Sequence, residues 1–236
     1  KAMDAVSEVQ ERVHEYKKKI ASGEAQSVLE SISPRERSIE VILHTMESQH
    51  LEFKASSWTP FQDERIIPET HGKKSEKLQD VILKTVAAFL NSDGGTLVIG
   101  VKDPKENQDG LIDPVILGIE PEYLALKEKD RNKEGYLKNL RKIFLNGFDE
   151  DKHPIIGTHI STQMIRVDSL SGNRQGVHGN TICRIDVTPV SKEDPTNAVW
   201  VTPLTEGGHF LYYRDADNSE PLQGPRATRY ISQNFG

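Results

Sequence analysis

The chain has 236 residues, of which 35% are hydrophobic and 28% charged, so it can form one large domain or one domain with a helical extension. No apolar run is long enough to cross a membrane and no secretory signal is visible, so we expect neither a membrane protein nor a secreted one. The formal net charge of −6 argues against a generally basic nucleic-acid binder, and any such binding must rely on a local basic patch or on metal ions.

The single cysteine, Cys183, cannot form a disulfide within the chain, which fits a reducing cytosol. It alternates with Ile185 and Val187, as inward-facing residues of a strand do. We therefore interpret Cys183 as a small core residue in place of a reactive thiol.

Residues 1–45 are predicted to be a helical extension. Apolar residues recur at helical spacing from Val6 to Ile20, and Gly23 marks a stop. A second helix is predicted from Pro34 to Met46, with Ser33 as its N-cap and Pro34 at its first position. The amphipathic stripe indicates either a core-facing helix or a coiled coil.

Residues 46–236 are predicted to form the main domain, which opens with a strand over His50–Ala55. A polar loop, Ser56–Ser75, leads into a helix over Lys77–Leu90. Asn91–Gly95 then supplies turn residues that tolerate positive φ. Thr96–Lys102 is almost continuously apolar, which is typical of a strand buried on both faces.

The remainder of the domain is predicted to contain a charged helix over residues 121–146 and a terminal helix over residues 225–234. Four further strands are expected at residues 158–167, 181–187, 198–202 and 209–214. Strand, helix, strand and helix followed by a run of strands indicates an α+β domain, with a mixed β-sheet flanked by helices.

Three acidic residues and one lysine are the strongest candidates for chemistry. Glu52 and Lys54 lie two apart on a predicted strand, so their side chains leave the same face, and Glu47 lies at the start of that strand. Carboxylates that hold a cation beside a lysine are typical of metal-dependent phosphodiesterases. Taken alone, a Glu-x-Lys pattern such as Glu52 and Lys54 is more often a solvated ion pair than a catalytic site. Asp103 before Pro104 is likewise more often a turn residue.

The combination of motifs resembles the Schlafen family and its AlbA-like prokaryotic relatives. The motifs are, in order, Glu47-Ser-Gln-His-Leu-Glu52-Phe-Lys54, Ala88-Phe-Leu-Asn-Ser-Asp-Gly-Gly95, Ile99-Gly-Val-Lys-Asp103, and Phe210-Leu-Tyr-Tyr-Arg214 followed by Asn218-Ser219. The resemblance spans about four fifths of the chain. It departs from the family pattern at Leu90 and in the long loop after Ser56.

The resemblance implies a metal-dependent endoribonuclease that cuts structured RNA such as tRNA or rRNA, as a defence or toxin effector does. Glu47, Glu52 and Asp103 would be ligands of Mg²⁺ or Mn²⁺, with Lys54 close by. RNA is favoured over DNA as the substrate. Schlafen nucleases pair two related lobes into a cleft. Because this chain carries the motifs of one lobe only once, a homodimer is expected. The alternative is a non-catalytic module of the same fold that binds DNA or RNA or serves regulation.

Basic side chains near the motifs are candidates for phosphate contacts: Lys73, Lys74, Lys84 and Arg214. For each lysine the other interpretation is a solvated charge. For Arg214 it is an ion pair with Asp215 or Asp217. Trp58 in the long loop either stacks on a base or fills the core.

Overall fold

The structure is a computed structural model that describes residues 33–62, 64–67, 72–105, 112–169 and 176–236. The first predicted helix, Val6 to Ile20, lies outside the described residues. Among the helices that are described, none is long and apolar enough to cross a membrane.

A four-stranded mixed sheet forms the centre of the domain, with the strand order β1-β4-β6-β5. β1 (Leu51–Lys54) pairs in parallel with β4 (Gly95–Ile99). β6 (Thr181–Val187) is antiparallel to both β4 and β5 (Ile160–Arg166). The predicted α+β fold with a mixed sheet is therefore confirmed, and so are the strands expected at these positions.

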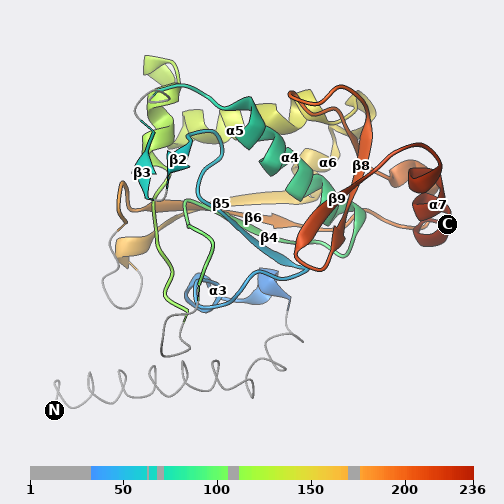
Figure 1. Cartoon of the computed structure of the whole chain (residues 1–236), viewed down its shortest axis with the longest axis horizontal. Helices are drawn as coiled ribbons and strands as arrows, with labels where there is room; N and C mark the ends of the chain where they lie inside the picture. The colour runs from blue at the N-terminus through green and yellow to red at the C-terminus, as the bar shows by residue number, and fades with distance from the viewer. Residues whose placement is uncertain (1–32, 63, 68–71, 106–111, 170–175) are drawn as a thin grey trace, which may run out of the picture.

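Helices cover both faces of this sheet. α4 (Glu76–Asn91) and α5 (Lys133–Gly147) lie above it in Figure 1, and the short α3 (Ile39–Ile42) lies below. Ser75 caps α4 by accepting the N–H of Leu78. Because both faces are covered, every residue of β4 is buried, as its continuous apolar sequence predicted.

A second sheet of three antiparallel strands packs against α4 beside the first sheet. Its strands are β7 (Trp200–Val201), β8 (Phe210–Asp215) and β9 (Asn218–Leu222). β9 was not predicted, because Pro221 and its polar neighbours do not look like a strand. The terminal helix, α7 (Gly224–Asn234), follows as predicted at the right end of the molecule (Figure 1).

Buried Asn91, at the end of α4, ties that helix to the second sheet. Its Nδ2 donates to the carbonyl oxygens of Val199 (2.8 Å) and Tyr212 (2.9 Å). Its Oδ1 accepts the N–H of Val199 at 2.7 Å. One amide side chain thus satisfies three backbone groups that would otherwise be buried without partners.

The predicted helix from Pro34 to Met46 is wrong in extent. The structure has a 3-10 turn, η1 (Pro34–Glu36), and then α3, for which Ser38 is the N-cap. Arg184 of β6 explains the break, because its guanidinium donates to the carbonyls of Pro34, Arg35 and Arg37. A continuous helix would use those carbonyls internally.

The predicted helix over residues 121–146 is also wrong in extent, since only its second half is an α-helix. Two 3-10 turns come first, η3 (Glu120–Ala125) and η4 (Glu128–Asp130). Asn132 then caps a new helix, α5, by accepting the N–H of Gly135 at 2.8 Å.

The loop predicted over Ser56–Ser75 contains a small hairpin. Its strands, β2 (Phe61–Gln62) and β3 (Arg65–Ile66), are two residues each, too short for a periodic pattern.

Candidate functional site at the ends of two parallel strands

The parallel pairing of β1 with β4 brings the candidate residues to one edge of the sheet. Lys54 lies opposite Ile99, and the carbonyl of Lys54 accepts the N–H groups of Gly100 (2.9 Å) and Val101 (3.3 Å). Gly100 has φ of +93°, a conformation that favours glycine, and it turns the chain out of β4. Asp103 follows at this edge and is exposed.

Glu52 is buried and holds two cations. Its Oε1 accepts a hydrogen bond from Nζ of Lys54, and its Oε2 accepts one from a guanidinium nitrogen of Arg214 at 2.9 Å. The Arg214 side chain has no exposed surface. Glu52 and Lys54 therefore share a face, as predicted, while Leu51 and Phe53 point to the opposite face and join the core below the sheet.

Arg214 braces the turn that precedes β1. Its guanidinium donates to the carbonyls of Ser48 (2.8 Å) and Gln49 (3.3 Å), and it lies 5.0 Å from the centre of the Phe89 ring. The ion-pair interpretation of Arg214 is thus realised with Glu52, in place of Asp215 or Asp217. A phosphate contact from this side chain would require it to leave partners in the protein.

Glu47 lies beside the same cluster. Its Oε1 accepts the N–H of Phe53 at 2.8 Å and is 4.0 Å from Nζ of Lys54. Burial raises the pKa of Glu47, and the charges of Glu52 and Asp103 act in the same direction, against the Phe53 hydrogen bond and Lys54. The three acids, up to 56 positions apart, therefore share one electrostatic neighbourhood.

The oxygen donors of these acids suit Mg²⁺ or Mn²⁺ in chemical type. In the arrangement seen here both oxygens of Glu52 bind cationic side chains and Oε1 of Glu47 binds a backbone N–H, so an ion shared by these acids would compete with Lys54 for Glu52. Within the part of the chain that the structure describes, no three His, Cys, Asp or Glu side chains are grouped so that they could hold a metal ion. The metal site stays a prediction.

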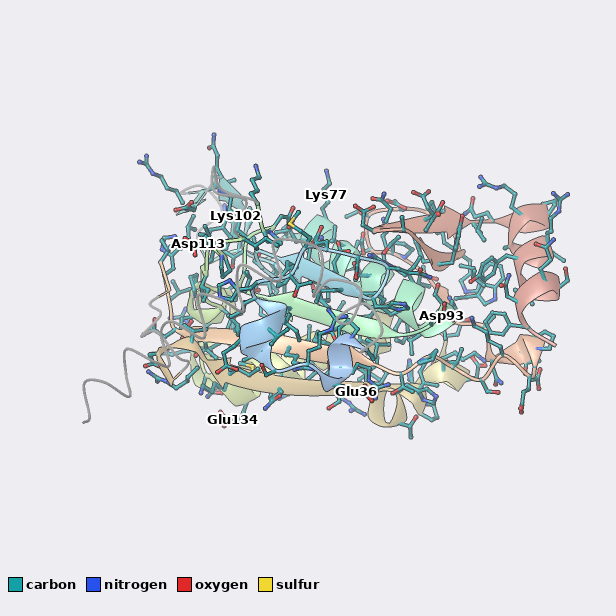
Figure 2. The ribbon with its side chains drawn as sticks, turned by 90° about the horizontal axis from the view of Figure 1, so that it is seen from below. Glu36, Lys77, Asp93, Lys102, Asp113 and Glu134 are labelled. Carbon is teal, nitrogen blue, oxygen red and sulfur yellow. The ribbon has the colours of Figure 1, made fainter. Side chains whose placement is uncertain are left out.

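The chain next to Asp103 carries charges of both signs. Lys102 and Asp113 lie at the same border of the molecule (Figure 2). Nζ of Lys102 is 3.6 Å from Oε1 of Glu64, a partly exposed ion pair. This border is therefore not a strongly basic entrance to the acidic cluster.

The lysines predicted to contact phosphate lie in different surroundings. Lys73 is exposed. Nζ of Lys74 donates to Oδ1 of Asn139 on α5 at 2.6 Å and lies 5.0 Å from the centre of the Trp58 ring. Lys84 instead forms an ion pair with Glu206 and lies over the Tyr212 ring. Phosphate contacts from these residues stay predictions, and Lys73 and Lys74 are the better placed.

Trp58 fills the core, so that interpretation is confirmed over stacking on a base. Its side chain is fully buried, and its indole N–H donates to the carbonyl of Glu122 at 3.0 Å. Cys183 is also fully buried, which confirms it as a core residue.

Sequence reasoning missed Glu122, which is fully buried beside Trp58. Its carboxylate accepts the N–H groups of Ser57 and Trp58, each at 3.0 Å. Burial raises its pKa to about 8 against these hydrogen bonds. Local sequence gave no signal, because Glu122 occurs in a stretch that reads as a charged helix surface.

The raised pKa of Glu122 predicts a loss of stability as the pH rises from 4.5 to about 8. The folded state binds this proton more tightly than the unfolded state, so the contribution is complete below pH 4.5, declines between 4.5 and 8, and is absent above 8. The decline is at most about 1.4 kcal/mol per pH unit. Urea unfolding of Glu122→Gln should lack this component, whereas Glu128→Gln, an exposed change, should keep it. Parallel curves for wild type and Glu122→Gln would contradict the assignment.

The fold and the site define an α+β domain whose mixed sheet presents a carboxylate–lysine cluster at the ends of two parallel strands. The family model described as Schlafen, AlbA_2 matches residues 47–223, about three quarters of the chain. The chain belongs to the Schlafen AlbA_2 family. Membership supports a function related to nucleic acid.

Among solved structures, the chain is similar to the DIP2311 protein from Corynebacterium diphtheriae, with a TM-score of 0.42 and 16% sequence identity. The similarity covers 93% of this chain and 29% of that chain, so this chain spans less than a third of that protein's length. A search of curated proteins found no match.

Proposed function

We propose that this domain binds nucleic acid without cleaving it, and that Glu52 holds the fold in place of a metal ion. The supporting observation is that both oxygens of the Glu52 carboxylate are occupied, by Lys54 and by the buried Arg214. A metal that displaced Arg214 would leave a guanidinium buried without its anionic partner, which costs several kcal/mol, and a metal that displaced only Lys54 would still share the carboxylate with Arg214.

The charges at the cluster agree with this proposal. The cluster contains three acids, Glu47, Glu52 and Asp103, and two cations, so its net charge is slightly negative. Asp103 is exposed and places negative charge next to solvent. A phosphate group gains nothing there from electrostatic attraction. The nucleic acid must therefore be attracted by a different, basic surface of the domain.

Metal-dependent cleavage of structured RNA is the second candidate. One observation favours it: Glu47, Glu52 and Asp103 are brought into one electrostatic neighbourhood with Lys54, as the family resemblance implies for a nuclease. It requires a rearrangement that frees Glu52 from Lys54. The Lys54 side chain is 23% exposed and can move, whereas that of Arg214 cannot without opening the core.

One experiment separates the two candidates. Labelled total tRNA and single-stranded DNA are incubated with the protein and Mn²⁺ or EDTA, and both mobility shifts and cleavage products are recorded. We expect shifted, intact nucleic acid in both conditions, and the same for Asp103→Asn. Products that require Mn²⁺ and disappear with Asp103→Asn would overturn the proposal in favour of the nuclease.

Asp103 is the better residue to mutate, because it is exposed and its change should leave the fold intact. Glu52→Ala would strip Arg214 of its partner, so lost activity in that variant would not distinguish catalysis from folding. Asp151→Asn is the matched control, an exposed aspartate that pairs with its neighbour Lys152. The homodimer and the cytosolic location stay predictions; light scattering tests the first.

A further inference from the structure

The exposed side of α5 is basic, although the chain as a whole is acidic. Three cations, Lys138, Arg141 and Lys142, are exposed, and their spacing of three and four residues places them on one side of the helix. Lys74, in the loop before α4, joins them through its hydrogen bond to Asn139 of α5. We call these four residues the α5 basic surface.

The positive charges of the α5 basic surface are not neutralised by nearby carboxylates. Across the described ranges of the chain, none of the four makes an ion pair, and the acceptor that Lys74 binds is an uncharged amide. The acid that α5 itself carries, Glu134, lies one helical turn before Lys138 on the same side of the helix, so the cations that follow it outnumber it three to one.

Like charges crowd one another on this surface. Burial lowers the pKa of Lys74, and the positive charge of Lys142 lowers it further, against the attraction of buried Glu122. An anion bound between Lys74 and Lys142 would relieve this repulsion. The surface is therefore suited to a ligand that brings several negative charges along a line.

We propose that the α5 basic surface binds the phosphate backbone of a nucleic acid, an inference that rests on the proposed function. The contacts would be sequence-independent, since phosphate groups carry no base information. The planar guanidinium of Arg141 can bind a phosphate through two hydrogen bonds, and the lysines add point charges. The surface also explains how an acidic domain attracts a polyanion.

An anionic membrane is the less suitable occupant. The apolar side of α5, which includes Tyr136, Leu140, Ile143 and Phe144, is buried in the core. A helix that binds in a membrane interface inserts its apolar face among the lipids. The exposed side of α5 carries mainly cations and polar side chains, which suits a solvated phosphate backbone.

The test is the salt dependence of binding to a labelled single-stranded RNA of mixed sequence. The variant combines Lys138→Gln, Arg141→Gln and Lys142→Gln, because glutamine keeps helix propensity and removes only the charge. Each lost phosphate contact lowers the slope of log K against log salt by about 0.7 on single strands, so three contacts lower it by about 2. We expect that change, with an affinity at least about tenfold weaker near physiological salt.

The control variant removes three exposed or half-exposed cations outside α5, with Lys192→Gln, Arg226→Gln and Arg229→Gln; the last two lie on α7 at the right end of the molecule in Figure 1. The control should keep the wild-type slope. An equal loss in both variants would assign binding to overall charge and overturn the inference. An unchanged slope in the α5 variant would also overturn it.

Two further outcomes are distinct. A wild-type protein that binds no RNA, tRNA or DNA even at low salt would refute the proposed function itself, and the inference with it. Wild-type binding to vesicles of anionic and neutral lipid, without binding to RNA, would reassign the surface to membranes. Circular dichroism confirms in each case that the variants are folded.

Discussion

Arg214→Met is expected to lower the free energy of unfolding by about 3 to 5 kcal/mol, because it leaves Glu52 charged and buried without its anchoring partner. The substitution also removes the hydrogen bonds that Arg214 donates to the carbonyls of Ser48 and Gln49, which stabilise the turn before β1. Urea unfolding with linear extrapolation measures the change. Arg226→Met, an exposed control, should stay within about 0.5 kcal/mol of wild type.

The double variant Glu52→Gln with Arg214→Met isolates the pair. It removes the buried carboxylate along with the guanidinium, so it should recover part of the stability that Arg214→Met loses. If Arg214→Met costs no more than the exposed control, the pair does not hold the fold. That result would also remove the main support for the binding function over the nuclease.

Asn91→Ala is expected to lower the free energy of unfolding by about 3 kcal/mol or more. The change leaves the carbonyls of Val199 and Tyr212 and the N–H of Val199 without the side chain that satisfies them. Each buried group left unpaired costs about 1 to 3 kcal/mol.

The same unfolding assay checks this prediction, with Asn146→Ala as its control, since Asn146 is exposed on α5. Alanine is the better helix former, so the control should be neutral or slightly stabilising. A small loss with Asn91→Ala would mean that water replaces the amide, so that Asn91 itself contributes little to the joining of α4 and the second sheet.

The elements that periodicity predicts are those in which the pattern itself reports burial. The alternation of β1 predicted that Glu52 and Lys54 share a face, and the unbroken apolar run of β4 predicted a strand covered on both sides. Turn residues then placed Asp103 at the edge where those two strands end. The gathering of the acidic residues was thus within reach of the sequence.

The residues that contact this cluster in the folded structure could not be predicted from the sequence. Arg214 lies 162 positions from Glu52, and no local pattern connects them. The burial of Glu122 and the docking of Lys74 on α5 depend on tertiary packing in the same way. The prediction of one helix over residues 121–146 was wrong for a local reason. The side chain of Asn132 accepts the N–H of Gly135 and starts a new helix there, although helix-forming residues lie on both sides.

The distance along the chain between Glu52 and Arg214 has a consequence for biosynthesis. Ribosomes add about 5 to 20 residues per second, so the 162 positions correspond to roughly 8 to 32 seconds. During that interval β1 has been synthesised with Glu52, but Arg214, the cationic partner of Glu52, has not been added to the chain. The domain can close only when nearly all of it has left the ribosome, and a nascent chain halted before β8 stays incomplete.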